Sequence, residues 1–83
     1  MPLYMDVHEK MDGLTAEAIK AAHEQDLKVQ GRYGVDYKKY WFDVNTGRAF
    51  CLVEAPSKDA ANTVHREAHG AVATELFEVQ EGG

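Results

Sequence analysis

The sequence "VDYKKYWFDVNTGRAFCLVE", from Val35 to Glu54, decides the fold because it predicts a β-hairpin in the middle of the chain. Residues 35–43 and 48–54 are rich in aromatic and other apolar side chains and show little helical periodicity, which is typical of strands. Between them lies the polar segment Asn45–Gly47, in which Asn and Gly favour the tight turn of a hairpin. The two strands are therefore expected to pair antiparallel.

One helix is predicted on each side of this hairpin. The preceding segment begins at Thr15, a residue type that caps helix N-termini, is rich in Ala and long side chains, and ends near Gly31 or Gly34. After the hairpin, Ser57 is a suitable N-cap and Gly70 a suitable C-cap for a second helix.

Two further strands are predicted at the ends of the chain. The segment "LYMDVH", residues 3–8, alternates and has one apolar face made of Leu3, Met5 and Val7, and "TELFEV", residues 74–79, alternates as well. The order β-α-β-β-α-β, with crossovers of helical length, favours a four-stranded antiparallel sheet with both helices on one face. We therefore predict a single ferredoxin-like α+β domain over residues 1–83.

Two helices on one face leave the other face of the sheet bare. We expect that face to carry aromatic side chains, with Tyr40, Phe42 and Phe50 as the candidates. An exposed apolar patch of this kind needs a cover, and many folds of this shape obtain it by pairing into a dimeric α/β barrel. The predicted assembly is therefore a homodimer or a higher homo-oligomer.

The composition argues against several classes of partner. The 83 residues include 14 acidic and nine basic side chains, a formal net charge of −5, and the basic residues are scattered apart from Lys38 and Lys39. Without a basic stripe, nucleic acid is not an expected partner. The chain has a single cysteine, no pattern of a signal peptide and no apolar run near the roughly 18 residues that cross a bilayer. We therefore expect a cytoplasmic protein without a membrane role.

The first helix places polar side chains where apolar ones are expected. Asp26 falls in the middle of the stripe that should meet the sheet, and His23 lies one turn earlier at the edge of that stripe. A buried carboxylate is costly unless it is paired, ligated or protonated. The pair is interpreted either as a structural hydrogen bond or as part of a site, in which the two residues are metal ligands or an oriented base.

The second helix carries two histidines four residues apart, His65 and His69 in "VHREAHG". The helical projection places both at the rim of the apolar stripe, at a spacing that lets two imidazoles converge on one ion. They are interpreted either as solvated side chains or as half of a coordination shell. Glu67 lies on the other side of the helix, so the segment lacks the geometry of the H-E-x-x-H metalloprotease motif, and that class is excluded.

Three more residues bear on a candidate site. His8 ends the first strand and Glu54 ends the third, and both can join a metal site if the two strand ends lie on the same side of the sheet. Cys51, in the third strand, is interpreted as a small buried side chain rather than as a ligand or a nucleophile. The candidate metal ligands are therefore His65, His69, His8, His23, Asp26 and Glu54.

The segments "YMDVH", "HEQDL", "FCLVEAPS" and "VHREAHG", in this order and spacing, resemble a family of small bacterial proteins typified by an actinobacterial nickel-binding protein of ferredoxin-like fold. The resemblance extends from about Leu3 to Val79. It implies a homodimer that binds divalent nickel and serves in its sequestration or detoxification. The resemblance assigns no ligands, so the candidates remain those chosen above, since imidazole suits nickel, zinc and copper and carboxylates can complete the shell with waters.

Two functions with chemistry remain open. The favoured one is a binder of nickel or another divalent transition metal, without catalytic activity. The alternative is a small enzyme of the dimeric α/β-barrel type, an isomerase or a cofactor-independent oxygenase, in which His23 and Asp26 form the polar site. Such an enzyme needs a pocket large enough for an organic substrate. A structural or interaction module without chemistry is the third hypothesis.

Overall fold

The central hairpin is present in the computed structural model, which describes residues 1–83. β2 (Asp36–Asp43) and β3 (Arg48–Glu54) pair antiparallel, and the turn between them contains Gly47 at a φ of 78°. β1 (Leu3–His8) pairs antiparallel with β3 on one side and with β4 (Glu75–Glu78) on the other, so that the order is β2-β3-β1-β4. This is the four-stranded antiparallel sheet that the sequence predicts.

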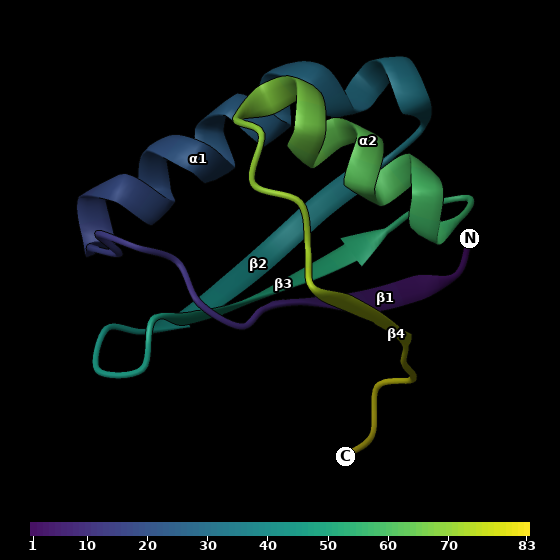
Figure 1. Ribbon diagram of the computed structural model, residues 1–83. Helices are drawn as coiled ribbons and strands as arrows, with labels where there is room; N and C mark the ends of the chain where they lie inside the picture. The colour runs from purple at the N-terminus through teal and green to yellow at the C-terminus, as the bar shows by residue number, and fades with distance from the viewer.

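Both helices, α1 (Ala16–Val29) and α2 (Lys58–Ala68), cover the same face of this sheet (Figure 1). They pack against each other as well as against the strands, so the molecule has one helical layer and one sheet layer. Neither helix is long and apolar enough to span a bilayer. The predicted ferredoxin-like α+β fold is confirmed.

The local sequence explains where the helices begin and end. The hydroxyl oxygens of Thr15 and Ser57 accept backbone hydrogen bonds and cap α1 and α2, as predicted. α1 continues into a short 3₁₀ helix, η1 (Gln30–Tyr33), and the helical segment stops at Gly34, which has a φ of 65° that other residues rarely adopt. Gly70, at a φ of 81°, reverses the chain after α2 in the same way.

The face of β1 that the helices cover is its polar one. Asp6 and His8 point toward the helices and are buried there with Tyr4, while the apolar residues of the strand are half-buried on the opposite face. The alternation of polar and apolar residues therefore predicts the strand correctly, but the hydrophobicity of its residues does not predict which face the helices cover. Asp6 can be buried because polar groups of the helices meet it, as described below.

The hydrophobic core lies between the sheet and the helices and draws on every layer. Its side chains come from β1, β2, β3 and α2 and from the segments that flank β2 and α2. Its buried members are Tyr4, Val35, Tyr37, Cys51, Val53, Ala55, Ala61 and Val64.

The bare face of the sheet carries a different set of aromatic residues from the expected one. Tyr40 and Phe42 lie opposite Cys51 and Ala49 of β3, which are buried under the helices, so both share the covered face. Of the three expected aromatics, Phe50 is the one on the bare face. We call this surface the open face; its apolar residues are Leu3, Met5, Val7, Trp41, Phe50, Leu52 and Phe77.

A β-bulge explains this difference. The register of β2 against β3 shifts between Tyr37 and Lys39, so the alternation of β2 moves by one residue. Tyr37 and Tyr40, three residues apart, therefore both face the helices, and Trp41 faces away from them.

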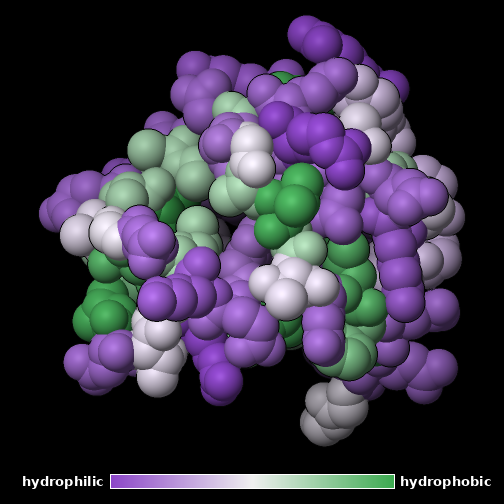
Figure 2. All heavy atoms as spheres, in the orientation of Figure 1, coloured by the Kyte–Doolittle hydropathy of each residue, from purple (hydrophilic) through white to green (hydrophobic).

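The surface seen in Figure 2, over helices and loops, is mostly hydrophilic, in keeping with the net charge of −5.

Candidate metal centre

His65 of α2 lies between two buried carboxylates. Its Nδ1 is 2.9 Å from Oδ1 of Asp26 in α1, and its Nε2 is 2.8 Å from Oδ2 of Asp6 in β1. The exposed fraction is 1% for His65, 2% for Asp26 and 0% for Asp6. One buried row of carboxylate, imidazole and carboxylate therefore joins both helices to the sheet.

The row is charged. Both ring nitrogens of His65 face a carboxylate oxygen, so each carries a proton and donates it. Burial alone would lower the pKa of His65, but the hydrogen bonds to Asp26 and Asp6 raise it to about 9. Burial would raise the pKa of each carboxyl, but the hydrogen bonds from His65 hold the pKa of both below the ordinary value. Two negative charges thus face one positive charge, which favours a further cation.

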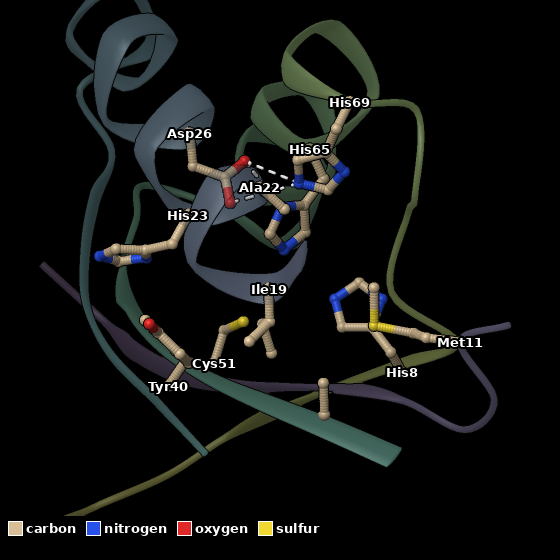
Figure 3. A pocket seen from close by; sticks show the side chains of 11 residues that line it. His8, Met11, Ile19, Ala22, His23, Asp26, Tyr40, Cys51, His65 and His69 are labelled. Atoms are coloured by element: carbon tan, nitrogen blue, oxygen red, sulfur yellow. Dashed lines mark hydrogen bonds and ion pairs between the residues drawn. The ribbon is translucent and has the colours of Figure 1, made fainter. Parts of the chain in front are cut away.

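His69, at the end of α2, is the second partner of Asp26. Its Nε2 lies 3.3 Å from Oδ2 and 3.1 Å from Oδ1 of Asp26, while its Nδ1 accepts a hydrogen bond from the N–H of Ala71 at 3.1 Å. Because Nδ1 is an acceptor, the proton on Nε2 points to the carboxylate. His65 and His69 therefore converge on one carboxylate, as Figure 3 shows.

On the other side of His65, Asp6 has one oxygen with partners and one without. Its Oδ2 accepts from His65 and lies 2.9 Å from the hydroxyl of Tyr37, which also lies 3.0 Å from the carbonyl oxygen of Ala61. Its Oδ1 has no hydrogen-bond partner. The Nε2 of His8 is 3.4 Å from this oxygen, too far for a good hydrogen bond. Asp6 is thus a buried carboxylate with one free acceptor.

Cys51 lies directly opposite Asp6 in the sheet and is buried under the helices, as its interpretation as a small core residue implies. Burial and the negative charge of Asp6 raise the pKa of the Cys51 thiol above its ordinary value. A neutral buried thiol is a poor nucleophile, so Cys51 is not an activated cysteine.

These side chains form two overlapping groups of metal donors. In each group, one donor atom per residue lies within 4.8 Å of the others, and His65 belongs to both. The first group is Asp26, His65 and His69, and the second is Asp6, His8, Cys51 and His65.

A small cavity lies beside both groups, between the helices and the sheet (Figure 3). Its volume of about 20 Å³ has room for a water molecule or an ion. Ligand pockets for organic molecules measure roughly 300 Å³ or more, so this cavity does not suit the organic substrate that the enzyme hypothesis requires.

The predicted pair of His23 and Asp26 is not formed. Asp26 points to α2 and binds His65 and His69, whereas the ring of His23 contacts the ring of Tyr40, with centroids 4.8 Å apart and planes tilted by 48°. His23 nevertheless lines the small cavity. The spacing of one helical turn predicts that the two residues lie close together. It does not predict their partners, because those partners are far away in the sequence.

The structure separates Glu54 from the other predicted ligands. Glu54 pairs with Leu3 at the start of β1, whereas His8 ends β1 opposite Ala49. Five residues along a strand span roughly 16 Å, so Glu54 and His8 lie at opposite ends of the sheet. Glu54 instead forms an ion pair with Lys38 at 2.7 Å.

His65 is more deeply buried than its helical projection predicts, and Asp6 is a site residue that the sequence did not indicate. His65 lies in the buried face of α2 beside Ala61 and Val64, not at its rim, because two carboxylates neutralise the ring. Asp6 escaped notice because an acidic residue on the polar side of an alternating strand is normally solvated. Its position two residues before His8, on the same face, was the available signal.

Comparisons with known proteins agree with this fold. The family described as "Nickel responsive protein SCO4226-like" matches residues 4–79. The crystal structure of SCO4226 from Streptomyces coelicolor A3(2) superposes with a TM-score of 0.90 at 37% sequence identity, covering 98% of this chain and 99% of that one. No curated protein matches. The chain therefore belongs to the nickel-responsive SCO4226-like family.

Proposed function

We propose that this protein binds a divalent transition metal ion, nickel in particular, between Asp26, His65 and His69. The observation that carries the proposal is the grouping of three nitrogen and oxygen donors within 4.8 Å of one another at the facing sides of two helices. Imidazole and carboxylate are donors that nickel accepts in proteins. The name of the family, nickel responsive, supports the same choice of ion.

The spacing of the donor atoms suits an octahedral ion. Two ligands that lie about 2.1 Å from an ion and at right angles to each other are about 3 Å apart. The Nδ1 of His65 and the Nε2 of His69 lie 2.9 Å and 3.1 Å from Oδ1 of Asp26. An ion can therefore replace the protons of these hydrogen bonds with little movement of the donors, and the adjacent cavity has room for a water as a further ligand.

Asp6 contacts the ring nitrogen of His65 that faces away from the proposed nickel site. When Nδ1 of His65 binds the ion, the N–H at Nε2 continues to donate to Asp6, which keeps the ring oriented. A carboxylate behind a ligating histidine also makes the histidine a stronger donor. Asp6 is thus a positioning residue for the proposed nickel site.

Calorimetric titration of nickel into the protein without a histidine tag tests the proposal. His69→Ala removes one of the three ligands and is expected to weaken nickel binding by about tenfold or more. His23→Ala is the matched control, because His23 lines the same cavity but lies outside the donor group, and its nickel affinity should equal that of the wild type. Equal affinity in the wild type and His69→Ala would contradict the assignment.

The cellular role that we propose for this binding is sequestration of nickel. A buried site with room for an ion suits a protein that holds nickel. Cells that produce the wild-type protein should tolerate more nickel than cells that produce His69→Ala at the same level. Equal nickel tolerance of the two kinds of cell would contradict sequestration as the cellular role, but it would not contradict nickel binding by the protein.

The partner that we propose is a second copy of the chain. The apolar residues of the open face come from all four strands, and two of them, Trp41 and Phe77, are each 49% exposed. Monomeric proteins rarely leave a contiguous apolar surface of this kind in water. Pairing of two open faces into an α/β barrel covers the surface and leaves the metal centre on the outer, helical side of each sheet.

A further inference from the structure

We propose a second metal site on the sheet side of His65, in which Asp6, His8 and Cys51 bind zinc(II). It goes beyond the proposed nickel site, because its donors are different atoms from different elements: two residues of β1 and one of β3. The two sites therefore share no donor atom.

The first observation is the free oxygen of Asp6. Oδ1 of Asp6 is the one buried side-chain nitrogen or oxygen atom of residues 1–83 that has no hydrogen-bond partner. A buried acceptor without a partner is costly, and a fully buried carboxylate oxygen more so. The polar side chains of His8 and Cys51 adjoin this oxygen, so a cation bound by all three would supply the missing partner.

The second observation is the spacing. The 3.4 Å between Oδ1 of Asp6 and Nε2 of His8 is long for a hydrogen bond. Two ligands of a tetrahedral ion, each about 2.0 Å from the metal, lie about 3.3 Å apart. The sulfur atom of Cys51 lies within 4.8 Å of a donor atom of Asp6 and of a donor atom of His8. The spacing therefore suits a four-coordinate ion better than a direct hydrogen bond.

The surrounding groups hold Asp6 in the orientation that this site needs. Its other oxygen, Oδ2, is engaged by the Nε2–H of His65 at 2.8 Å and by the hydroxyl of Tyr37 at 2.9 Å. Such outer hydrogen bonds fix the direction of a ligating carboxylate. Oδ1 is thereby left toward His8 and Cys51.

The thiol decides the class of ion. Cysteine, histidine and aspartate together, with water as the fourth ligand, form a tetrahedral set that zinc binds. Binding replaces the proton of the Cys51 thiol by the metal, and that proton leaves to solvent, because a coordinating thiol is deprotonated outright. The nickel site, by contrast, has only nitrogen and oxygen donors.

The site lies close to the surface on one side. His8 and Met11 line both the small inner cavity and an outer depression of about 430 Å³ that also includes residues 70–72 and Thr74. Figure 3 shows His8 and Met11 together at one end of the inner cavity, away from His23. His8 and Met11 thus separate the inner cavity from the outer depression.

Titration with cobalt(II), a spectroscopic substitute for zinc, tests this proposal on the whole protein. The wild type should develop a thiolate-to-cobalt charge-transfer band in the near ultraviolet together with the visible bands of a tetrahedral ion. Cys51→Ser should lose the charge-transfer band, and His8→Gln should weaken cobalt binding by about tenfold or more. His69→Ala is the matched control and should keep the band, although it weakens nickel binding.

Three results would overturn the second site: no thiolate band in the wild type, a band that persists in Cys51→Ser, or unchanged cobalt affinity in His8→Gln. If Cys51→Ser does not fold, X-ray absorption of the zinc-loaded wild type decides. A sulfur neighbour at about 2.3 Å supports the site, and a shell of nitrogen and oxygen alone overturns it. Loss of nickel binding in His69→Ala with the cobalt band intact would separate the two proposals.

Discussion

The side chain of His65 bridges two carboxylates of different elements because imidazolium has two N–H groups that point in nearly opposite directions. Lysine and the neutral amides carry all their side-chain donors on one nitrogen, so they cannot bridge two carboxylates in this way. Removing one carboxylate leaves the other groups of the row buried with an unmatched charge or hydrogen bond, which costs more than the intact pair contributes. The row is therefore more sensitive to a single deletion than a surface ion pair.

Asp6→Asn should show this sensitivity. The change keeps the size of the side chain but removes its charge, so we expect the free energy of unfolding to fall by about 3 kcal/mol. The pKa of His65 should also fall from its value of about 9, because one of the two carboxylates that raise it is gone. Chemical denaturation measures the first quantity, and an NMR titration of the His65 ring measures the second.

Asp36→Asn is the control for that experiment, because Asp36 forms a half-exposed pair with Lys38 at 3.2 Å and contacts no buried ion. Its stability should match that of the wild type, as surface pairs contribute little. An unchanged His65 pKa in Asp6→Asn would mean that Asp6 does not hold the imidazolium.

The stability of the metal-free protein should depend on pH through the same row. The pKa of His65 is raised from 6.5 to about 9 on folding, so its contribution is full below pH 6.5 and is lost as the pH rises through 9. This loss is at most about 3 kcal/mol. The pKa values of Asp6 and Asp26 are lowered, so their contribution is present above their ordinary values and disappears in acid.

Denaturation in the presence of a chelator, at a series of pH values, checks this profile. The wild type should be most stable between about pH 4 and 6.5 and should weaken toward pH 9 and above. The free energy of unfolding of His65→Gln should not change between pH 6.5 and 9. A wild type that is as stable at pH 9.5 as at pH 6 would show that His65 is not an imidazolium.

At the scale of elements, the sequence predicts what is local and misses what is not. Caps and turn residues located both helices and the hairpin, because Thr15, Ser57 and Gly47 act on the backbone beside them. The covered face of β1 and the burial of His65 depend on pairing between residues that are 59 positions apart. Hydrophobic periodicity cannot register such pairs, since each charged residue alone is typical of a solvated face.

The end of α2 positions His69 and can be tested by Gly70→Ala. Gly70 has a φ of 81°, and no atom lies within 4 Å of an added Cβ, so the cost is backbone strain alone. We expect the free energy of unfolding to fall by about 1 kcal/mol. Nickel affinity should fall a few-fold, because the turn holds the Ala71 N–H that orients the His69 ring. Denaturation and calorimetry measure the two effects.

Gly82→Ala is the matched control, because Gly82 lies near the C-terminus, also has open space around its Cβ position and has no positive φ. Neither stability nor nickel affinity should change in this variant. Full stability of Gly70→Ala would mean that the turn after α2 does not need a left-handed residue.

At the scale of the whole molecule, the sheet carries apolar side chains on both sides, although in β1 the polar residues are the ones that face the helices. The helix-covered side contains a buried charged cluster, and the open side carries a row of apolar residues. This arrangement suits a subunit whose open face is buried on assembly, because the sheet then has a second core beneath it. The same arrangement explains the outcome for β1. Its alternating pattern correctly predicted a strand, but its apolar face lies on the open side of the sheet and not under the helices.

Trp41→Glu tests this assembly at a residue that the subunit fold already tolerates in water. Trp41 lies on the open face and is 49% exposed, so a charge there should leave the fold intact but should be desolvated when two open faces meet. We expect sedimentation velocity to show a dimer for the wild type and a monomer for Trp41→Glu at the same concentration. Leu27→Glu is the matched control, because Leu27 is 44% exposed on α1, away from the sheet, and this variant should remain dimeric. A wild type that stays monomeric at every concentration, or a dimer that Trp41→Glu does not weaken, would mean that the open face has another role.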